Sequence, residues 1–153
     1  MHAEYMQLAL TLAEKATRDG EPPFGALLVG PDGKVLADST DRVVAEADMT
    51  RHAEVNVVQL ASRALGADLT GCTLYTTVEP CPMCFTSAWL ARVSRVVFGC
   101  TMDAVHSVTL GQQRELRIPA SEVNARSGEP IELLGGVLAE ACLKLFEARD
   151  DDR

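Results

Sequence analysis

The chain has 153 residues, enough to bury the core of one ordinary domain without disulfide bonds. Its 22 acidic residues outnumber 14 basic ones, and the formal net charge of -8 disfavours a long phosphate backbone as a partner. Because the five cysteines are an odd number and no secretory leader opens the chain, we expect a reducing, cytoplasmic setting, and no apolar run approaches membrane-spanning length.

Helical and strand patterns alternate through the first hundred residues. Apolar side chains at steps of three and four predict a helix over 3–16 that stops before Gly20. Two short apolar runs flank the Pro-Asp-Gly turn at 31–33 and predict a β-hairpin. A helix is predicted from Ala53 to Gly66, and after it a strand, a helix and a strand follow one another up to Cys100.

The pattern weakens after Cys100. Residues 101–130 lack clear periodicity and indicate a loop with short helices. A strand at 131–134 and a helix at 137–148 close the chain, before the charged tail "RDDDR". The order of elements predicts one α/β domain over residues 1–153, a three-layer αβα sandwich with a mixed sheet of about five strands. We expect antiparallel pairing at the hairpin and parallel pairing afterwards.

The stretch "TVEPCPMC" places Cys81 and Cys84 three positions apart, directly after a predicted strand. Taken alone, the pair fits a redox site, a metal site or two buried thiols about equally well. The upstream stretch "RHAE" favours the metal, because it supplies His52 and Glu54. Two thiolates and one imidazole leave one zinc position open for water, which is typical of a catalytic site.

Helix geometry supports this grouping. Cysteines three apart share one helix face, and Pro82 suits the first position of a helix. His52 and Glu54 are two apart and converge only where a helix begins. A helix that starts at Ala53 places His52 at its cap and Glu54 in its first turn. Two helix N-termini would then direct their positive ends at one point, which favours thiolates and developing negative charge.

The pair "HAE" and "EPCPMC" resembles the zinc-dependent cytidine deaminase superfamily. The resemblance extends from about "PPFGALLV" to "VVFGC" and is strongest to the branch that holds guanine deaminases, fungal-type cytosine deaminases and tRNA adenosine deaminases. It implies a cytidine deaminase-like fold, with Zn²⁺ as cofactor held by His52, Cys81 and Cys84. It also implies that Glu54 is the catalytic proton shuttle and not a ligand.

The implied activity is hydrolytic removal of a ring amino group as ammonia. The implied partner is a small heterocyclic base: guanine or isoguanine, cytosine or an aza-analogue, or an aminotriazine. A tRNA-specific adenosine deaminase is the alternative, which the mostly acidic end "EARDDDR" disfavours. A zinc module without catalysis is a third reading, and the intact Glu54 argues against it. We expect a homodimer, as in similar small domains.

The resemblance also implies substrate contacts from Phe24, Ala53 and Asp41. Phe24 would pack on a flat ring, and burial in the core is an equally weighted alternative. Relatives usually carry asparagine eleven residues before the metal histidine, where this chain has Asp41. An ionised carboxylate only accepts hydrogen bonds, so we expect a preference for amino-rich rings unless Asp41 is a surface turn residue. Asp103 and Phe146 are expected in the outer pocket wall.

Other polar and aromatic residues carry weaker predictions. We expect Glu79 to orient the turn before Cys81 by accepting backbone N–H groups. Trp89 is expected in the core, His106 towards solvent and His2 as a terminal bystander. Three cysteines without metal spacing are expected to be buried small side chains: Cys72, Cys100 and Cys142.

Overall fold

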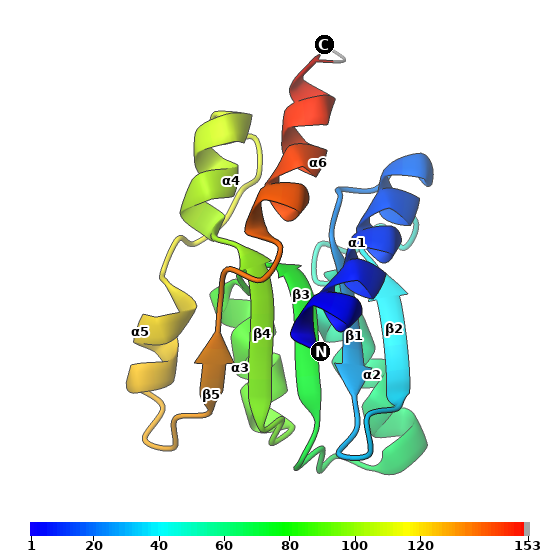
Figure 1. The fold of residues 1–153 in the computed structure, drawn as a ribbon, viewed down its shortest axis with the longest axis vertical. Helices are drawn as coiled ribbons and strands as arrows, with labels where there is room; N and C mark the ends of the chain where they lie inside the picture. The colour runs from blue at the N-terminus through cyan, green and yellow to red at the C-terminus, as the bar shows by residue number, and fades with distance from the viewer. Residues whose placement is uncertain (152–153) are drawn as a thin grey trace.

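A central five-stranded sheet organises the protein (Figure 1), whose structure is a computed structural model that describes residues 1–151, with side chains through residue 147. The strand order is β2-β1-β3-β4-β5. In chain order the strands are β1 (Gly25–Val29), β2 (Val35–Thr40), β3 (Thr73–Val78), β4 (Arg95–Cys100) and β5 (Glu132–Leu134). The predicted mixed α/β sheet of about five strands is confirmed.

Strand directions follow the connections between strands. β1 pairs antiparallel with β2 through the tight turn at 30–34, with Gly25 opposite Thr40. β1 also pairs antiparallel with β3, whereas β3, β4 and β5 are parallel to one another. Parallel neighbours need a crossover, and α3 supplies the one between β3 and β4. The predicted change from antiparallel to parallel pairing is therefore confirmed.

Helices cover both faces of the sheet and complete three layers (Figure 1). One face carries α1 (His2–Arg18), α4 (Met102–Thr109) and α6 (Ala139–Asp151). The other carries α2 (Ala53–Leu65), α3 (Pro82–Leu90) and α5 (Ala120–Ala125). Each layer encloses its own apolar core, so the sheet is buried on both sides.

The C-terminal helix continues further than predicted. Residues 149–151 of the expected charged tail belong to α6, and residues 152–153 lie outside the described part of the chain. Phe146 is 1% exposed and meets Phe24 edge to face, with ring centroids 5.3 Å apart. The placement of Phe146 in a pocket wall was therefore wrong, because α6 turns this ring into the core.

Among residues 1–151, no helix combines the length and apolarity needed to cross a bilayer.

Helix α1 packs very closely on the sheet. A side chain at Gly25 would collide with the backbone of Ala9, so this position of β1 requires glycine. The N-terminal end of the helix is held by His2, whose Nδ1 lies 2.6 Å from the hydroxyl of Tyr75. The prediction that His2 is a terminal bystander was wrong.

Candidate functional site

Two helices of the same layer begin side by side and supply the candidate ligands. His52 is the N-cap of α2 and has extended backbone angles. Cys81 is the N-cap of α3, and Pro82 occupies the first turn, where a missing N–H costs no hydrogen bond. Cys84 lies one turn further along α3 and is completely buried. The predicted helix starts at Ala53 and around Cys81 are both confirmed.

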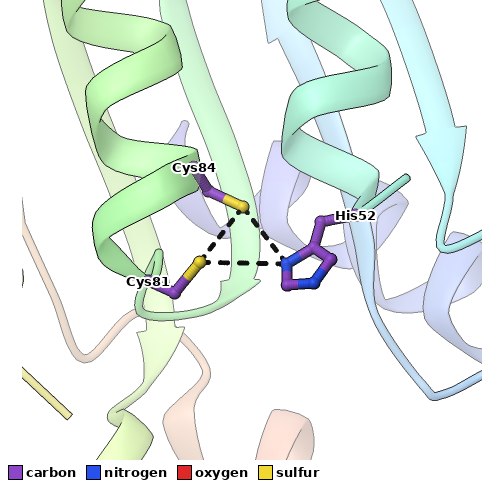
Figure 2. Close-up of side chains that lie close together, drawn as sticks. All are labelled: His52, Cys81 and Cys84. Atoms are coloured by element: carbon purple, nitrogen blue, oxygen red, sulfur yellow. Dashed lines mark hydrogen bonds between the residues drawn. The ribbon is translucent and has the colours of Figure 1, made fainter. Parts of the chain in front are cut away.

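The three ligating atoms converge on one point (Figure 2). His52 Nδ1 lies 3.3 Å from Cys84 Sγ and 3.8 Å from Cys81 Sγ, and the two sulfurs are 3.5 Å apart. Zinc with sulfur at ~2.3 Å and nitrogen at ~2.0 Å in tetrahedral geometry sets its ligand atoms roughly 3.5 Å apart. The spacing and the donor set therefore fit a zinc ion. Three protein ligands leave the fourth tetrahedral position free for water or substrate.

Glu54 stands beside this triad in the first turn of α2. Its side chain is 4% exposed, and its Oε1 has no hydrogen-bond partner within the described residues. Burial raises the pKa of Glu54, while the nearby His52 imidazole opposes that rise. A buried carboxylate oxygen without a donor is costly, and a water on the metal would supply the missing donor. This orphan oxygen is a second observation that fits a metal site.

The two thiols of the triad differ in their protonation. The hydrogen bond with Cys84, followed by the contact with His52, lowers the pKa of Cys81 to about 4. The same contact with Cys81, together with burial, raises the pKa of Cys84. The hydrogen bond with Cys81 raises the pKa of His52 to about 9. One thiolate beside an imidazolium is therefore favoured in this geometry. The thiolate is in the form that a metal ligand requires, and a bound metal would displace the proton of the imidazole.

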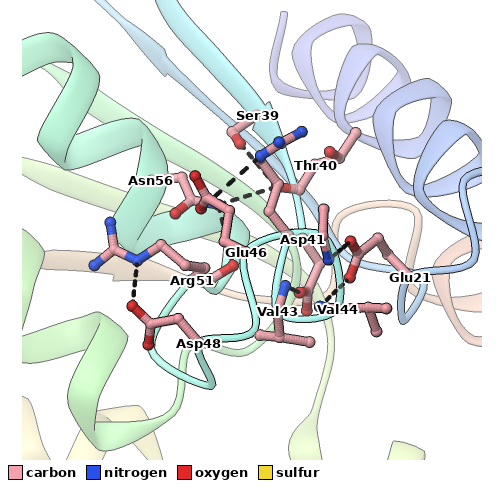
Figure 3. A network of polar contacts seen from close by, with 12 residues as sticks. Glu21, Ser39, Thr40, Asp41, Val43, Val44, Glu46, Asp48, Arg51 and Asn56 are labelled. Atoms are coloured by element: carbon pink, nitrogen blue, oxygen red, sulfur yellow. Dashed lines mark hydrogen bonds and ion pairs between the residues drawn. The ribbon is translucent and has the colours of Figure 1, made fainter.

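A polar loop leads from β2 to the start of α2 (Figure 3), and Asp41 is buried where it begins. Asp41 is 3% exposed, and its Oδ1 accepts the amide of Val43 at 3.0 Å. The buried carboxylate of Glu21 accepts the next two amides, of Val44 and Ala45, both at 2.8 Å. Burial raises the pKa of Asp41 to about 6, and the proximity of His52 opposes this rise. Asp41 is thus a buried residue near the triad and not a surface turn residue.

Glu79 acts as a backbone acceptor, as predicted, but over a longer range. Its Oε1 accepts the amide of Met102 at 3.1 Å, and its Oε2 accepts the amide of Ala120 at 2.9 Å. These amides lie at the starts of α4 and α5. One carboxylate next to the cysteine turn therefore anchors two points, Met102 and Ala120, of the unpatterned segment 101–130.

Glu115 lies in that segment, between α4 and α5, and no sequence pattern indicated it. Its Oε1 is buried and has no hydrogen-bond partner among the described residues. Burial, followed by the charge of Cys81, raises the pKa of Glu115 to about 7, and His52 opposes this rise. Its carboxylate therefore lies within electrostatic range of two triad residues. A lone glutamate in an irregular loop carries no spacing rule, so sequence reasoning missed it.

The remaining predicted contacts have varied surroundings. Ala53 is completely buried as the first residue of α2. Phe24 is partly buried and packs against both cores, and its carbonyl accepts the amide of Asp41. Asp103 is exposed on α4 and forms an ion pair with Arg117 at 3.4 Å, and it is not among the residues that the structure gathers at the triad. Their roles as substrate contacts stay predictions.

Outside the triad, the Trp89 and cysteine predictions agree with the structure, whereas the expectation that His106 faces solvent does not. Trp89 packs against the core beside α3 and donates through its Nε1 to the carbonyl of Glu129. His106 is half-buried on α4. The three cysteines without metal spacing are buried: Cys72, Cys100 and Cys142.

A cavity of about 450 Å³ lies between α3 and α5, lined partly by Trp89, but no triad residue lines it. The triad therefore defines the candidate site by its chemistry and not by cavity size.

Residues 1–100, which contain the whole triad and Glu54, match the family described as the cytidine and deoxycytidylate deaminase zinc-binding region. The chain belongs to this family. The expectation of a zinc-dependent deaminase domain is thereby confirmed, and zinc is the cofactor that the triad fits. The family membership also confirms the cytidine deaminase-like fold expected from the sequence.

This deaminase-family chain is similar to proteins of different named activities. It is 39% identical over 99 residues to a guanine deaminase of Bacillus subtilis, covering 63% of each chain. It is 44% identical over 96 residues to a tRNA-specific adenosine deaminase of Agrobacterium fabrum, covering 62% of each chain. A solved structure of guanine deaminase from Nitrosomonas europaea superposes with a TM-score of 0.81 at 27% identity, covering 95% of this chain and 84% of that one.

One similar protein is much longer. The chain is 47% identical over 94 residues to tRNA(Ile)-lysidine synthase of Deinococcus deserti, which covers 61% of this chain. The matched region spans only 18% of that synthase. The comparison therefore leaves the substrate open.

Proposed function

We propose that the protein is a zinc-dependent hydrolytic deaminase of a free nucleobase or a related amino-substituted heterocycle. The observation that carries the proposal is the convergence of His52 Nδ1 and the sulfurs of Cys81 and Cys84, all within 4.8 Å of one another, beside the unpartnered Oε1 of Glu54. We further propose that the whole of residues 1–153 forms one such domain.

His52, Cys81 and Cys84 would hold the zinc ion. When bound, zinc supplies a Lewis acid that activates water for attack on the ring carbon that bears the amino group. Overall, water adds its oxygen to that carbon, the carbon–nitrogen bond breaks, and ammonia leaves while the ring keeps a carbonyl. One water is consumed for each ammonia released.

Glu54 would move the protons of this reaction. Its free oxygen takes one proton from the attacking water and delivers it to the adjacent ring nitrogen. It then takes the second proton from the new hydroxyl group on the ring carbon and delivers it to the leaving amine. Burial of Glu54, which is 4% exposed, raises the pKa of its carboxyl group. A carboxyl group with a raised pKa is suited both to accept and to donate a proton during the reaction. Its position in the first turn of α2, two residues after the ligand His52, holds it beside the metal.

An ammonia-release screen tests the function. Zinc-loaded protein is incubated with purines, pyrimidines, their nucleosides and aminotriazines, and ammonia is measured by a coupled dehydrogenase assay. We expect release from at least one free base or triazine, and none from the zinc-loaded Glu54→Gln variant. Absence of ammonia with every ring would contradict the proposal.

A tRNA-specific adenosine deaminase is the second candidate, favoured by the 44% identity to the Agrobacterium fabrum protein. The net charge of -8 opposes it, and so does the exposed loop beside Asp41, which carries Glu46 and Asp48. Inosine formation in tRNA anticodon stem-loops, read by nuclease digestion and mass spectrometry, distinguishes the two candidates. We expect no inosine at enzyme concentrations that deaminate a free base.

We also propose a homodimer in a cytoplasmic setting. Apolar side chains exposed on α3, Met83 at 38% and Leu90 at 69%, support an association surface. The cysteines are unpaired, which suits a reducing compartment. Light scattering coupled to gel filtration tests the dimer, and a mass of one chain would contradict it.

A further inference from the structure

Asn56 is a neutral polar residue on the buried side of α2. It is 4% exposed, and the buried residues that follow it on the helix are apolar. Burial of an amide is unfavourable unless its hydrogen-bonding groups are paired. Metal binding and proton transfer use His52 and Glu54 and give Asn56 no part. The reason for an asparagine at this position therefore lies in the hydrogen bonds that it makes.

The side-chain amide of Asn56 joins two backbone carbonyl groups. Its Nδ2 donates to the carbonyl of Arg51 at 3.0 Å and to the carbonyl of Thr40 at 3.2 Å (Figure 3). Thr40 is the last residue of β2, and Arg51 directly precedes the triad residue His52. An NH₂ group has two hydrogens, so one amide can serve both carbonyls. Asn56 therefore holds the end of a sheet strand beside the start of α2.

The backbone of Asn56 makes a further contact on the other side of His52. Its N–H donates to the carbonyl of His52 at 3.0 Å, the ordinary bond of a first helical turn. The Arg51 carbonyl belongs to the peptide group before the Cα of His52, and the His52 carbonyl belongs to the peptide group after it. Asn56 thus holds both peptide groups whose orientations define the backbone angles of His52, φ -62° and ψ 150°.

The imidazole itself has few other constraints. His52 is the N-cap of α2, but its side chain makes no capping hydrogen bond. Within the described part of the chain, the hydrogen bonds of its ring are those with Cys81 and Cys84, the other members of the triad. The Arg51 carbonyl also accepts the amide of Arg42 at 3.0 Å, which closes the loop at its base. The direction of the imidazole therefore depends on a backbone that is fixed from outside the triad.

From these contacts we infer that Asn56 is a positioning residue of the metal centre. It holds the backbone of His52 so that Nδ1 meets the two sulfurs of the triad. Asn56 contacts neither the metal nor the substrate and acts through His52. The inference rests on the proposed function and adds to it a residue that determines zinc affinity. Loss of a residue that orients a metal ligand weakens metal binding by roughly 10- to 100-fold.

Removal of the Asn56 amide tests this role. Asn56→Ala deletes both side-chain hydrogen bonds and keeps a strong helix former in α2. We expect the zinc Kd to rise roughly tenfold or more, measured by competition with a chromophoric chelator. Co²⁺ in place of zinc gives a second readout, because its visible absorption bands depend on the arrangement of its ligands. These bands should differ between the parent protein and Asn56→Ala, and neither readout needs a substrate.

Asn124 offers a matched control on α5. Its Nδ2 donates to the carbonyl of Ile131 at 2.8 Å, and its Oδ1 accepts the amide of Ile131 at 2.9 Å. It is thus a second asparagine that joins backbone groups, but it lies outside the triad. Asn124→Ala should lower the melting temperature of zinc-free protein, as Asn56→Ala does, and leave the zinc Kd unchanged within about twofold. The comparison separates positioning of the ligand from a general loss of stability.

The zinc Kd values decide the role of Asn56. An unchanged Kd in Asn56→Ala, or an equal loss of zinc affinity in both variants, overturns the inference. If Asn56→Ala does not fold, Asn56→Ser takes its place with the same expectation, because one hydroxyl donor cannot serve both carbonyls. Ammonia release is a separate measurement. A protein that releases no ammonia from any ring contradicts the proposed function, whereas a higher zinc Kd in Asn56→Ala alone still supports the positioning role.

Discussion

The imidazole Nδ1 of His52 lies 3.3 Å from Cys84 Sγ, although 32 positions separate the two residues in the chain. This contact joins the beginning of α2 to the first turn of α3. A metal held there would therefore connect two helices that each follow a different strand. Metal content, stability and catalysis should depend on the same few atoms.

Replacing Cys84 should remove the metal. Cys84→Ser offers a poorer zinc ligand, and we expect zinc affinity to fall roughly tenfold or more, with loss of ammonia release. Elemental analysis after dialysis against a competing chelator measures the effect. Cys72→Ser is the matched control: Cys72 is buried but distant from the ligand set, so full zinc occupancy should persist. Equal zinc content in both variants would contradict the assignment.

Removing zinc should destabilise the native protein. A ligand that binds only the folded state stabilises it by about 4 kcal/mol when present at a thousand times its Kd. Chelation should therefore lower the melting temperature, and added zinc should restore it. The Cys84→Ser variant should have the same melting temperature with chelator as without it. An unchanged melting curve for the parent protein would argue against a bound metal.

Glu54→Gln should separate metal binding from catalysis. The amide keeps the size of the side chain but accepts no proton, so we expect full zinc content and a roughly 10²- to 10⁴-fold lower kcat. Ammonia release and elemental analysis on the same sample provide both readouts. Glu14→Gln, on the exposed face of α1, should behave as the parent protein. An active, zinc-loaded Glu54→Gln variant would refute the proton-shuttle role.

Glu79→Gln should loosen the segment that carries Glu115. Both oxygens of Glu79 accept backbone amides, whereas glutamine offers only one acceptor, so one amide loses its partner. We expect a loss of about 1–3 kcal/mol in the free energy of unfolding, measured by urea denaturation. Glu147→Gln, exposed on α6, serves as the control. A difference below about 0.5 kcal/mol between the two variants would contradict the anchoring role.

The buried thiols outside the triad should resist alkylation at alkaline pH. Burial disfavours the charged thiolate and raises the pKa of Cys100 to about 12 and that of Cys142 to about 11. At pH 9 an ordinary thiol is largely ionised, but these two remain protonated and unreactive. Peptide mapping after iodoacetamide treatment should find them unmodified in native protein and modified in urea. Rapid labelling of Cys100 at pH 9 would show that it is not buried.

Much of the layout could be predicted because its signals are local. The Pro-Asp-Gly turn defines the hairpin, and the helix starts at Ala53 and Pro82 follow from periodicity and proline chemistry. The triad could be predicted because zinc chemistry restricts ligand type and spacing. In each case a few neighbouring residues were sufficient.

The sequence failed where long-range packing decides the outcome. Leu8 belongs to the pattern of apolar residues at steps of three and four that predicts the helix over 3–16, yet it is 49% exposed. The sheet contacts a neighbouring face of α1, centred on Ala9 and Ala13. Leu60 on α2 is likewise 48% exposed. Glu115 is brought near the triad by an irregular segment that Glu79 anchors from outside it. No periodicity encodes such a contact.

The strand directions place the two ends of the sheet under different constraints. Asp41 follows the end of β2 and both metal-bearing helices begin at that same end, whereas the exposed Pro31–Lys34 turn joins β1 to β2 at the other end (Figure 1). The turn is thus a place where the polypeptide can be lengthened or cut. A peptide tag inserted there, or new termini created there by circular permutation, should leave the metal centre intact.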